Sequence, residues 1–122
     1  TVFGGLQTRP NIHIKDMANI YKHFLINSDL ESGFYNAGFE NISILNIAKL
    51  IQSKIACDIE IKDSNDPRSY RQDSSKIIET GFKPKKNVDI EISEIIASYK
   101  NGLLQDKPEW HTVRWMKSNN YS

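Results

Sequence analysis

The sequence predicts a small α/β domain in which short strands alternate with about four helices. Three observations indicate this class. Apolar residues recur at helical spacing in three segments, one segment alternates polar and apolar residues as a half-buried strand does, and glycine and proline punctuate the intervals. A length of 122 residues allows one domain with a real core, so we expect residues 1–122 to form a single unit.

The first part of the chain is expected to hold two strands, a helix and a third strand. A first strand precedes the second, NIHI at 11–14, and a short buried strand lies within GFYNAG at 33–38, with Gly33 and Gly38 as punctuation. The helix follows NIHI, and Asp16 is placed to cap its first turn. Its apolar stripe consists of Met17, Ile20, Tyr21, Phe24 and Leu25.

The second part is expected to hold three helices and one strand. Ser43 caps a helix whose stripe is Ile44, Ile47, Ala48, Ile51 and Ile55. The strand is DIEIK at 58–62, which alternates with a period of two. Asp73 caps a short helix that ends near Thr80, because Gly81 suits a left-handed position after a helix and Pro84 prevents continuation. The last long helix carries Ile92, Ile95, Ile96, Tyr99 and Leu103 on one face, and a tail with two tryptophans follows.

Composition excludes several classes of protein. The net charge of +1 offers no broad basic surface, so we expect neither a nucleic-acid partner nor an acidic membrane surface. No apolar run approaches the roughly 20 residues that span a bilayer. The single cysteine, Cys57, favours a reducing compartment, and we expect a cytoplasmic protein. The chain begins with TVFGG and has no initial methionine, so we expect it to be a fragment of a longer protein.

The sequence lacks the usual signatures of catalysis. FGGLQ has no third glycine and precedes no helix, so it is not a dinucleotide fingerprint, and there is no P-loop. The three histidines and one cysteine have no metal-ligand spacing. No tyrosine has a lysine four residues after it. We therefore expect no catalytic residue, no metal and no bound cofactor in this chain.

Two basic segments are candidates for binding an anion. Pro10 biases Arg9 towards an extended conformation, so the guanidinium leaves the chain in a defined direction. Arginine suits phosphate because its planar fork donates two parallel hydrogen bonds to an oxyanion. Further on, Arg68 and Tyr70 precede a helix start. Asn36, after a buried strand, lies where α/β sheets place ligands.

Each candidate has a structural alternative. Taken by itself, Arg9 is better explained as a solvated arginine at a turn, and Asn36 is equally explained as a side chain that satisfies turn backbone. His13 alternates with its apolar neighbours and is expected to be a hydrogen-bonded structural histidine. Two arginines and two aspartates of one loop can simply pair: Arg68, Arg71, Asp63 and Asp66.

Four segments, in this order, resemble the C-terminal substrate-binding part of the extended short-chain dehydrogenases/reductases, the NAD-dependent nucleotide-sugar epimerases and dehydratases. They are VFGGLQTRPNIHIKDMA, FYNAGFENISILNIAKLI, DPRSYRQDSSKI with ETGFKP, and the helix before the tryptophan tail. The resemblance covers nearly the whole chain. It implies a substrate-binding lobe without its Rossmann domain, which would lie upstream and carry the Gly-rich loop and the Tyr-x-x-x-Lys pair.

The resemblance also implies roles for particular residues. Arg9 occupies the place of the arginine that reaches the diphosphate of the nucleotide-sugar, and Val2 and Phe3 belong to the strand that lines the base. Many members carry Arg-x-Gly-Asp in the later loop, whereas this chain has DSND. Asp63 therefore replaces the second phosphate arginine and only Asp66 matches. Arg68 is the candidate substitute, and the expected substrate-binding set is Val2, Phe3, Arg9, Asn36, Asp66, Arg68 and Tyr70.

The expected function follows from that resemblance. The parent enzyme would bind NAD in its Rossmann domain, oxidise a sugar hydroxyl and then epimerise or dehydrate the keto sugar, and it would be a homodimer. The lobe would bind the nucleotide diphosphate sugar and pack on the Rossmann domain of its own chain, and it would be inactive alone. The alternatives are a lobe of an NAD(P)-dependent reductase of the same fold and a stand-alone protein-interaction module.

Overall fold

Helices and short strands alternate along the chain, which confirms the predicted α/β class. The computed structural model describes residues 1–66 and 68–120. In that part of the chain the elements are β1 (Val2–Phe3), β2 (Thr8–Asn11), α1 (Ile14–Ile26), β3 (Glu40–Ser43), α2 (Ile44–Gln52), β4 (Ile61–Lys62), α3 (Ser75–Glu79), α4 (Val88–Lys100), the 3-10 turn η1 (Pro108–Trp110) and α5 (Thr112–Ser118).

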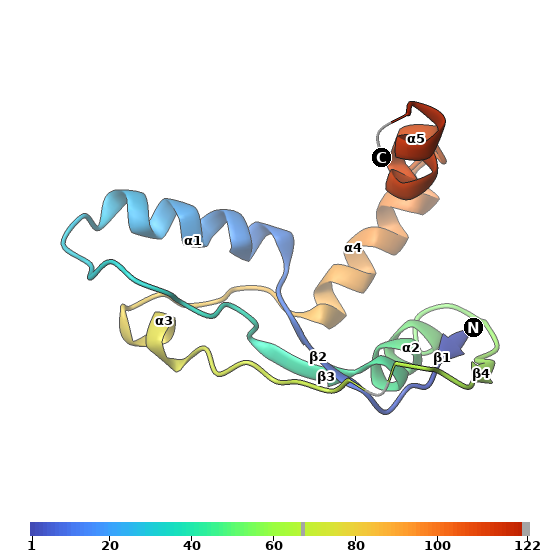
Figure 1. Cartoon of the computed structure of the whole chain (residues 1–122), viewed down its shortest axis with the longest axis horizontal. Coiled ribbons are helices and arrows are strands. Elements are labelled where there is room, and N and C mark those ends of the chain that lie inside the picture. Colours follow the sequence, from blue (N-terminus) through green and yellow to red (C-terminus); the bar gives the residue numbers. More distant parts are fainter. Residues whose placement is uncertain (67, 121–122) are drawn as a thin grey trace.

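The strands form two separate pairs (Figure 1). β1 and β4 are parallel, with Val2 opposite Ile61. β2 and β3 are antiparallel, and their register places Arg9 opposite Ile42. Pro10 has no N–H to donate, so it is tolerated in a sheet of only two strands, where one side of each strand carries no partner strand. The sequence did not predict β3, because ENIS has neither an apolar run nor a clear alternation.

The main core lies between α1 and α3. Ile20, Ile77 and Phe82 are buried there, and Tyr35, Ala37 and Phe39 of the segment that leads into β3 pack against them. This segment was predicted to contain a buried strand, and that prediction is wrong. Tyr35 packs against Phe24 with ring centroids 4.8 Å apart, but the segment has no strand partner, and Phe34 is 99% exposed. A two-residue apolar run indicates burial of one side chain, not a strand.

The start of α1 also differs from the prediction. The NIHI run does not continue as a strand, because the helix already begins at Ile14. His13 is the N-cap and its ring accepts a hydrogen bond from the amide of Lys15, a structural role of the kind predicted for this histidine. Asp16 lies in the first turn of the helix and is fully buried. Its carboxylate is used for a tertiary contact, so the prediction that Asp16 is the cap is wrong.

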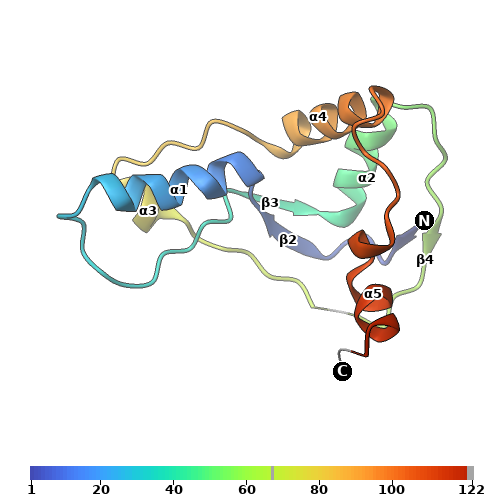
Figure 2. The same cartoon turned by 90° about the horizontal axis from the view of Figure 1, so that it is seen from above.

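A second packed region joins α2 to α4, which lie alongside each other (Figure 2). Ser43 caps α2 as predicted, since its hydroxyl accepts from the amide of Asn46 at 3.2 Å. α2 ends at Gln52, before the last residue of the predicted stripe, Ile55. The predicted strand 58–62 is reduced to its last two residues, which pair with β1.

The short helix and its end agree with the sequence in part. α3 begins at Ser75 with Ser74 at the cap position, so the prediction that Asp73 is the cap is wrong. The carboxylate of Asp73, one residue earlier, nevertheless accepts from the amide of Ser75 at 2.9 Å. The hydroxyl of Ser75, and then its amide, lower the pKa of Asp73. Gly81 has a φ of 88°, the left-handed conformation predicted for it.

The predicted face of the last helix is only partly buried. Ile92 is buried, whereas Ile95 and Tyr99 are 50% and 73% exposed and Leu103 lies beyond the end of α4. α5 lies at the far end of α4, away from both sheets (Figure 1). Within residues 1–66 and 68–120, no helix combines the length and the apolar character that crossing a membrane requires.

Candidate anion-binding site

Arg9 lies on β2, and residues 68–70 run beside the start of that strand. The amide of Thr8 donates to the hydroxyl of Ser69 at 2.9 Å, and the amide of Tyr70 donates to the carbonyl of Thr8 at 3.2 Å. These two bonds fix the later loop against the strand. Residues that are about sixty positions apart in the sequence are thereby brought to one place.

The guanidinium of Arg9 is held from several sides. Its Nη1 donates to the carbonyls of Thr8 and Arg68, and its Nη2 lies 3.4 Å from a carboxylate oxygen of Asp66. The ring of Tyr70 lies against it, with 4.7 Å from the Arg9 Cζ to the ring centroid. Only 22% of the Arg9 side chain is exposed. It is therefore not the freely solvated arginine of the structural alternative.

Asp66 and Arg68 form a close ion pair beside Arg9. One Asp66 oxygen accepts from Nε of Arg68 at 2.7 Å and also from the Arg68 amide at 3.1 Å, and the other accepts from Nη2 at 2.9 Å. The Arg68 guanidinium and then its amide lower the pKa of Asp66 from 3.8 to about 2. The Arg68 side chain is 74% exposed, so it is free to change partners. The sequence alternative in which Arg68 pairs with Asp66 describes this state.

We call Arg9, Asp66, Arg68 and Tyr70 the Arg9 cluster. A hollow of about 300 Å³ adjoins it and is lined by Gly4, Leu6, Gln7, Ser64, Asp66 and Ser69. A larger groove of about 840 Å³ runs along α1, but Glu31 is the one charged residue that lines it. Neither arginine lines the smaller hollow, but Asp66, which does line it, pairs with both Arg9 and Arg68. The smaller hollow is therefore the better candidate, because binding of an anion needs donors and positive charge nearby.

The other predicted site residues do not join this cluster. Val2 is buried, so its side chain faces the interior, whereas Phe3 on the same strand is 60% exposed. Asn36 donates to the carbonyl of Asp73 at 3.2 Å and thus satisfies loop backbone, as the structural alternative proposed. The prediction that Asn36 follows a strand is wrong, since residues 33–38 form none.

Several residues that position the later loop were not predicted. The amide side chain of Asn41 on β3 donates to the carbonyl of Gln72 and accepts from its N–H, at 3.0 and 2.9 Å. Ser74 accepts from the amide of Gly38 at 3.1 Å. A Cβ on Gly38 would lie 2.4 Å from the Cβ of Pro10, so only glycine fits this crossing. Nothing local in the sequence signals these contacts, because they depend on which segments meet.

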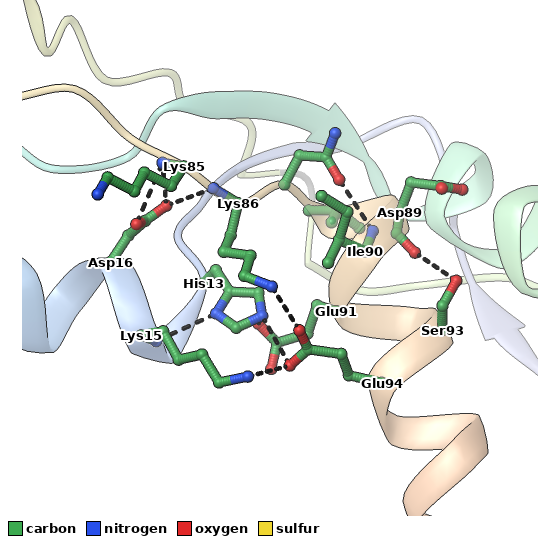
Figure 3. Close-up of polar contacts among 12 residues, drawn as sticks. His13, Lys15, Asp16, Lys85, Lys86, Asp89, Ile90, Glu91, Ser93 and Glu94 are labelled. Atoms are coloured by element: carbon green, nitrogen blue, oxygen red, sulfur yellow. Dashed lines mark hydrogen bonds and ion pairs between the residues drawn. The ribbon is translucent and has the colours of Figure 1, made fainter.

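A second group of polar residues joins the start of α1 to α4 (Figure 3). The carboxylate of Asp16 accepts from the amides of Lys85 and Lys86, the shortest bond being 2.8 Å. Nδ1 of His13 accepts from the Lys15 amide, so the ring proton lies on Nε2. We call this group the α1–α4 cluster; its members are His13, Lys15, Asp16, Lys85, Lys86, Glu91 and Glu94.

Carboxylates of α4 surround the His13 ring. Nε2 lies 3.3 Å from Glu91 and 3.4 Å from Glu94, close enough for attraction although not aligned for a hydrogen bond. Glu94 also pairs with Lys15 at 2.8 Å and Lys86 at 2.7 Å. These two lysines lower the pKa of Glu94 from 4.5 to about 2. The charged groups of this cluster therefore pair with one another, and they connect the start of α1 to α4.

The Arg9 cluster is suited to hold an oxyanion. It holds a mostly exposed guanidinium, Arg68, beside the largely covered guanidinium of Arg9 and the ring of Tyr70, next to a hollow. Among the residues that the structure describes, no group of three or more His, Cys, Asp or Glu side chains has the arrangement of a metal site. No protein-family model and no curated protein matches the chain.

Proposed function

We propose that this chain is a nucleotide-sugar-binding lobe of an NAD-dependent epimerase or dehydratase, and that Arg9 binds the diphosphate of the substrate. The observation that carries the proposal is the meeting of Arg9 with Arg68 and Tyr70, which are distant in sequence. Two guanidiniums that share one neighbourhood can bind two phosphoryl groups, each through bidentate hydrogen bonds. In the family that the sequence resembles, an arginine at the position of Arg9 has this role.

The NAD, the hydride transfer and the homodimer belong to the proposed parent enzyme. The lobe contributes by holding the substrate in place, which is itself a large part of the rate enhancement that an enzyme provides. The residues that we assign to the substrate are Arg9 and Arg68, with Tyr70 as an aromatic neighbour and Phe3 as the exposed residue of the base-lining strand.

Calorimetric titration of the chain with a nucleoside diphosphate tests this proposal without knowledge of the sugar. We expect Arg9→Ala to weaken binding about tenfold to a hundredfold, since a hydrogen bond to a charged group contributes roughly 1.5–3 kcal/mol. Arg9→Lys should recover only part of the loss, because an ammonium group does not reproduce the planar fork. Equal affinity in all three proteins would remove Arg9 from the site.

Two controls accompany the titration. Arg114→Ala removes the same charge from exposed α5 and should leave the affinity unchanged. The unfolding free energy of Arg9→Ala should stay within about 1 kcal/mol of wild type, since ion pairs near the surface contribute little to stability. A lobe of a reductase that acts on another carbonyl substrate would show no Arg9-dependent binding of a nucleoside diphosphate.

A second candidate function is a protein-interaction module, and the exposed apolar side chains of α1 favour it. Ile14, Tyr21 and Leu25 are 68%, 67% and 82% exposed and recur at helical spacing. Under the first proposal this face packs on the Rossmann domain. Under the second it binds another protein, and the chain should not respond to nucleotides in the same calorimeter.

A further inference from the structure

The carboxylate of Asp66 occupies the position of an anionic ligand in the Arg9 cluster. It accepts from the amide and the guanidinium of Arg68 and lies 3.4 Å from Nη2 of Arg9. Both guanidiniums that would bind an external anion thus already face one internal negative charge. The ordinary explanation is a local turn that is closed by a salt bridge, but that turn needs only Arg68. The approach to Arg9, 57 residues away in the chain, is not explained by it.

We propose that Asp66 competes with the ligand for Arg9 and Arg68, and so sets the affinity that an anion needs in order to occupy the site. This inference rests on the proposed function of the Arg9 cluster. The three charged side chains sum to one positive charge, with Arg9 and Arg68 at +1 each and Asp66 at −1.

The charge of the ligand and the covalent attachment of Asp66 to the chain determine which anions can displace it. A monoanion that displaces Asp66 exchanges one negative charge for another and gains nothing in attraction. Asp66 is also attached to the chain, so its effective concentration at Arg68 is in the millimolar range or above, and a dilute monoanion does not displace it. A diphosphate carries more charge and more acceptor oxygens, and it can pair with both guanidiniums at once.

The arrangement allows Asp66 to leave without dismantling the site. Arg68 is mostly exposed and can turn towards a ligand, while Arg9 stays fixed by the two carbonyls and the ring of Tyr70. When the carboxylate withdraws, the amide of Arg68 also becomes available as a donor. The ligand therefore gains a backbone N–H in addition to two guanidiniums.

Asp66→Asn provides the test, because an asparagine oxygen still accepts from the Arg68 amide while the charge is removed. Inorganic pyrophosphate and acetate serve as the probes, followed through the NMR signals of the Ser69 and Tyr70 amides. We expect Asp66→Asn to bind pyrophosphate about twofold to fivefold tighter than wild type, the range that loss of one exposed ion pair allows. Acetate should gain no more than pyrophosphate does, because both ligands displace the same carboxylate and acetate carries less charge.

The controls separate this inference from the proposed function. Asp29→Asn removes one exposed charge from the loop after α1 and should bind both probes like wild type. If wild type binds pyrophosphate in an Arg9-dependent manner but Asp66→Asn binds it equally or more weakly, Asp66 is not a competitor, and only the inference is overturned. If wild type, Asp66→Asn and Arg9→Ala all show no pyrophosphate binding, the proposed function is overturned and the inference with it.

Discussion

Arg9 and His13 are close neighbours in the sequence, yet they belong to two polar clusters of opposite character. The ring of His13 is 1% exposed, and the buried side chains of the α1–α4 cluster, His13 and Asp16, have partners within the protein. In the Arg9 cluster, Arg68 is 74% exposed and one carboxylate serves two guanidiniums. The first cluster joins elements of the fold, whereas the second presents charge to solvent.

Both clusters consist mainly of charged residues, but they have different roles in the protein. A buried charge must be fully paired, because an unpaired one costs several kcal/mol, so the partners of Asp16 cannot be exchanged for an outside ligand. An exposed pair has little net stability and gives up its partner readily. Burial therefore separates the two roles better than residue type does.

Removing Asp16 should have the largest effect on stability. Asp16→Ala leaves the amides of Lys85 and Lys86 without an acceptor beside a buried helix turn, and we expect the free energy of unfolding to fall by about 3 kcal/mol. Denaturant titration measures the change. Asp29→Ala, at an exposed carboxylate, should cost less than about 0.5 kcal/mol. Equal losses of unfolding free energy in the two variants would mean that the α1–α4 cluster does not stabilise the fold.

Loss of the His13 cap should have an intermediate effect. His13→Ala removes the acceptor for the Lys15 amide, which should reduce the free energy of unfolding by about 1–2 kcal/mol. His13→Asn should recover much of the loss, because asparagine is among the best N-cap residues. If alanine and asparagine are equally destabilising, the cap bond is not what His13 contributes.

Lowering the pH should remove the contribution of Glu94 to stability over a defined pH range. We expect this effect to be smaller than those of Asp16→Ala and His13→Ala. Its folded pKa of about 2 lies below the ordinary 4.5, so the contribution of the carboxylate to stability is complete above pH 4.5 and is lost as the pH falls towards 2. We expect wild type to be more stable than Glu94→Gln above this window and the two to converge within it. Glu109→Gln, in η1, is the control, because it removes one negative charge outside the α1–α4 cluster. A difference between wild type and Glu94→Gln that is independent of pH would contradict this assignment.

The sequence predicted the parts of the fold that local pattern determines. α2 with its Ser43 cap and the left-handed Gly81 follow from helical spacing and end preferences within a few residues. β3 was missed and residues 33–38 were wrongly assigned a strand, because a strand of a few residues is defined by its partner. Likewise, aspartate is a residue type that often caps helices, but the partners of Asp16 lie about seventy residues away in the sequence.

The candidate site was predicted to a similar extent. Arg9, Arg68 and Tyr70 were selected for their chemistry, and the structure brings them together. The contacts of Asn41 and Ser69 were not predicted, since side chain to backbone bonds between segments leave no periodic signal. The position of Asp66 between two arginines was not predicted either, because a local sequence pattern describes each loop separately.

The separation of Arg9 and Arg68 along the chain links ligand binding to folding. The two residues lie 59 positions apart, and closing a loop of that length costs the unfolded chain roughly 3–4 kcal/mol in entropy. The folded sheets bring the residues together before any ligand arrives, so an anion that bridges them binds the folded chain alone. At about a hundred times its Kd such a ligand stabilises the fold by roughly 2.7 kcal/mol. Under the proposed function, the fraction of folded protein and its melting temperature therefore depend on the concentration of the ligand.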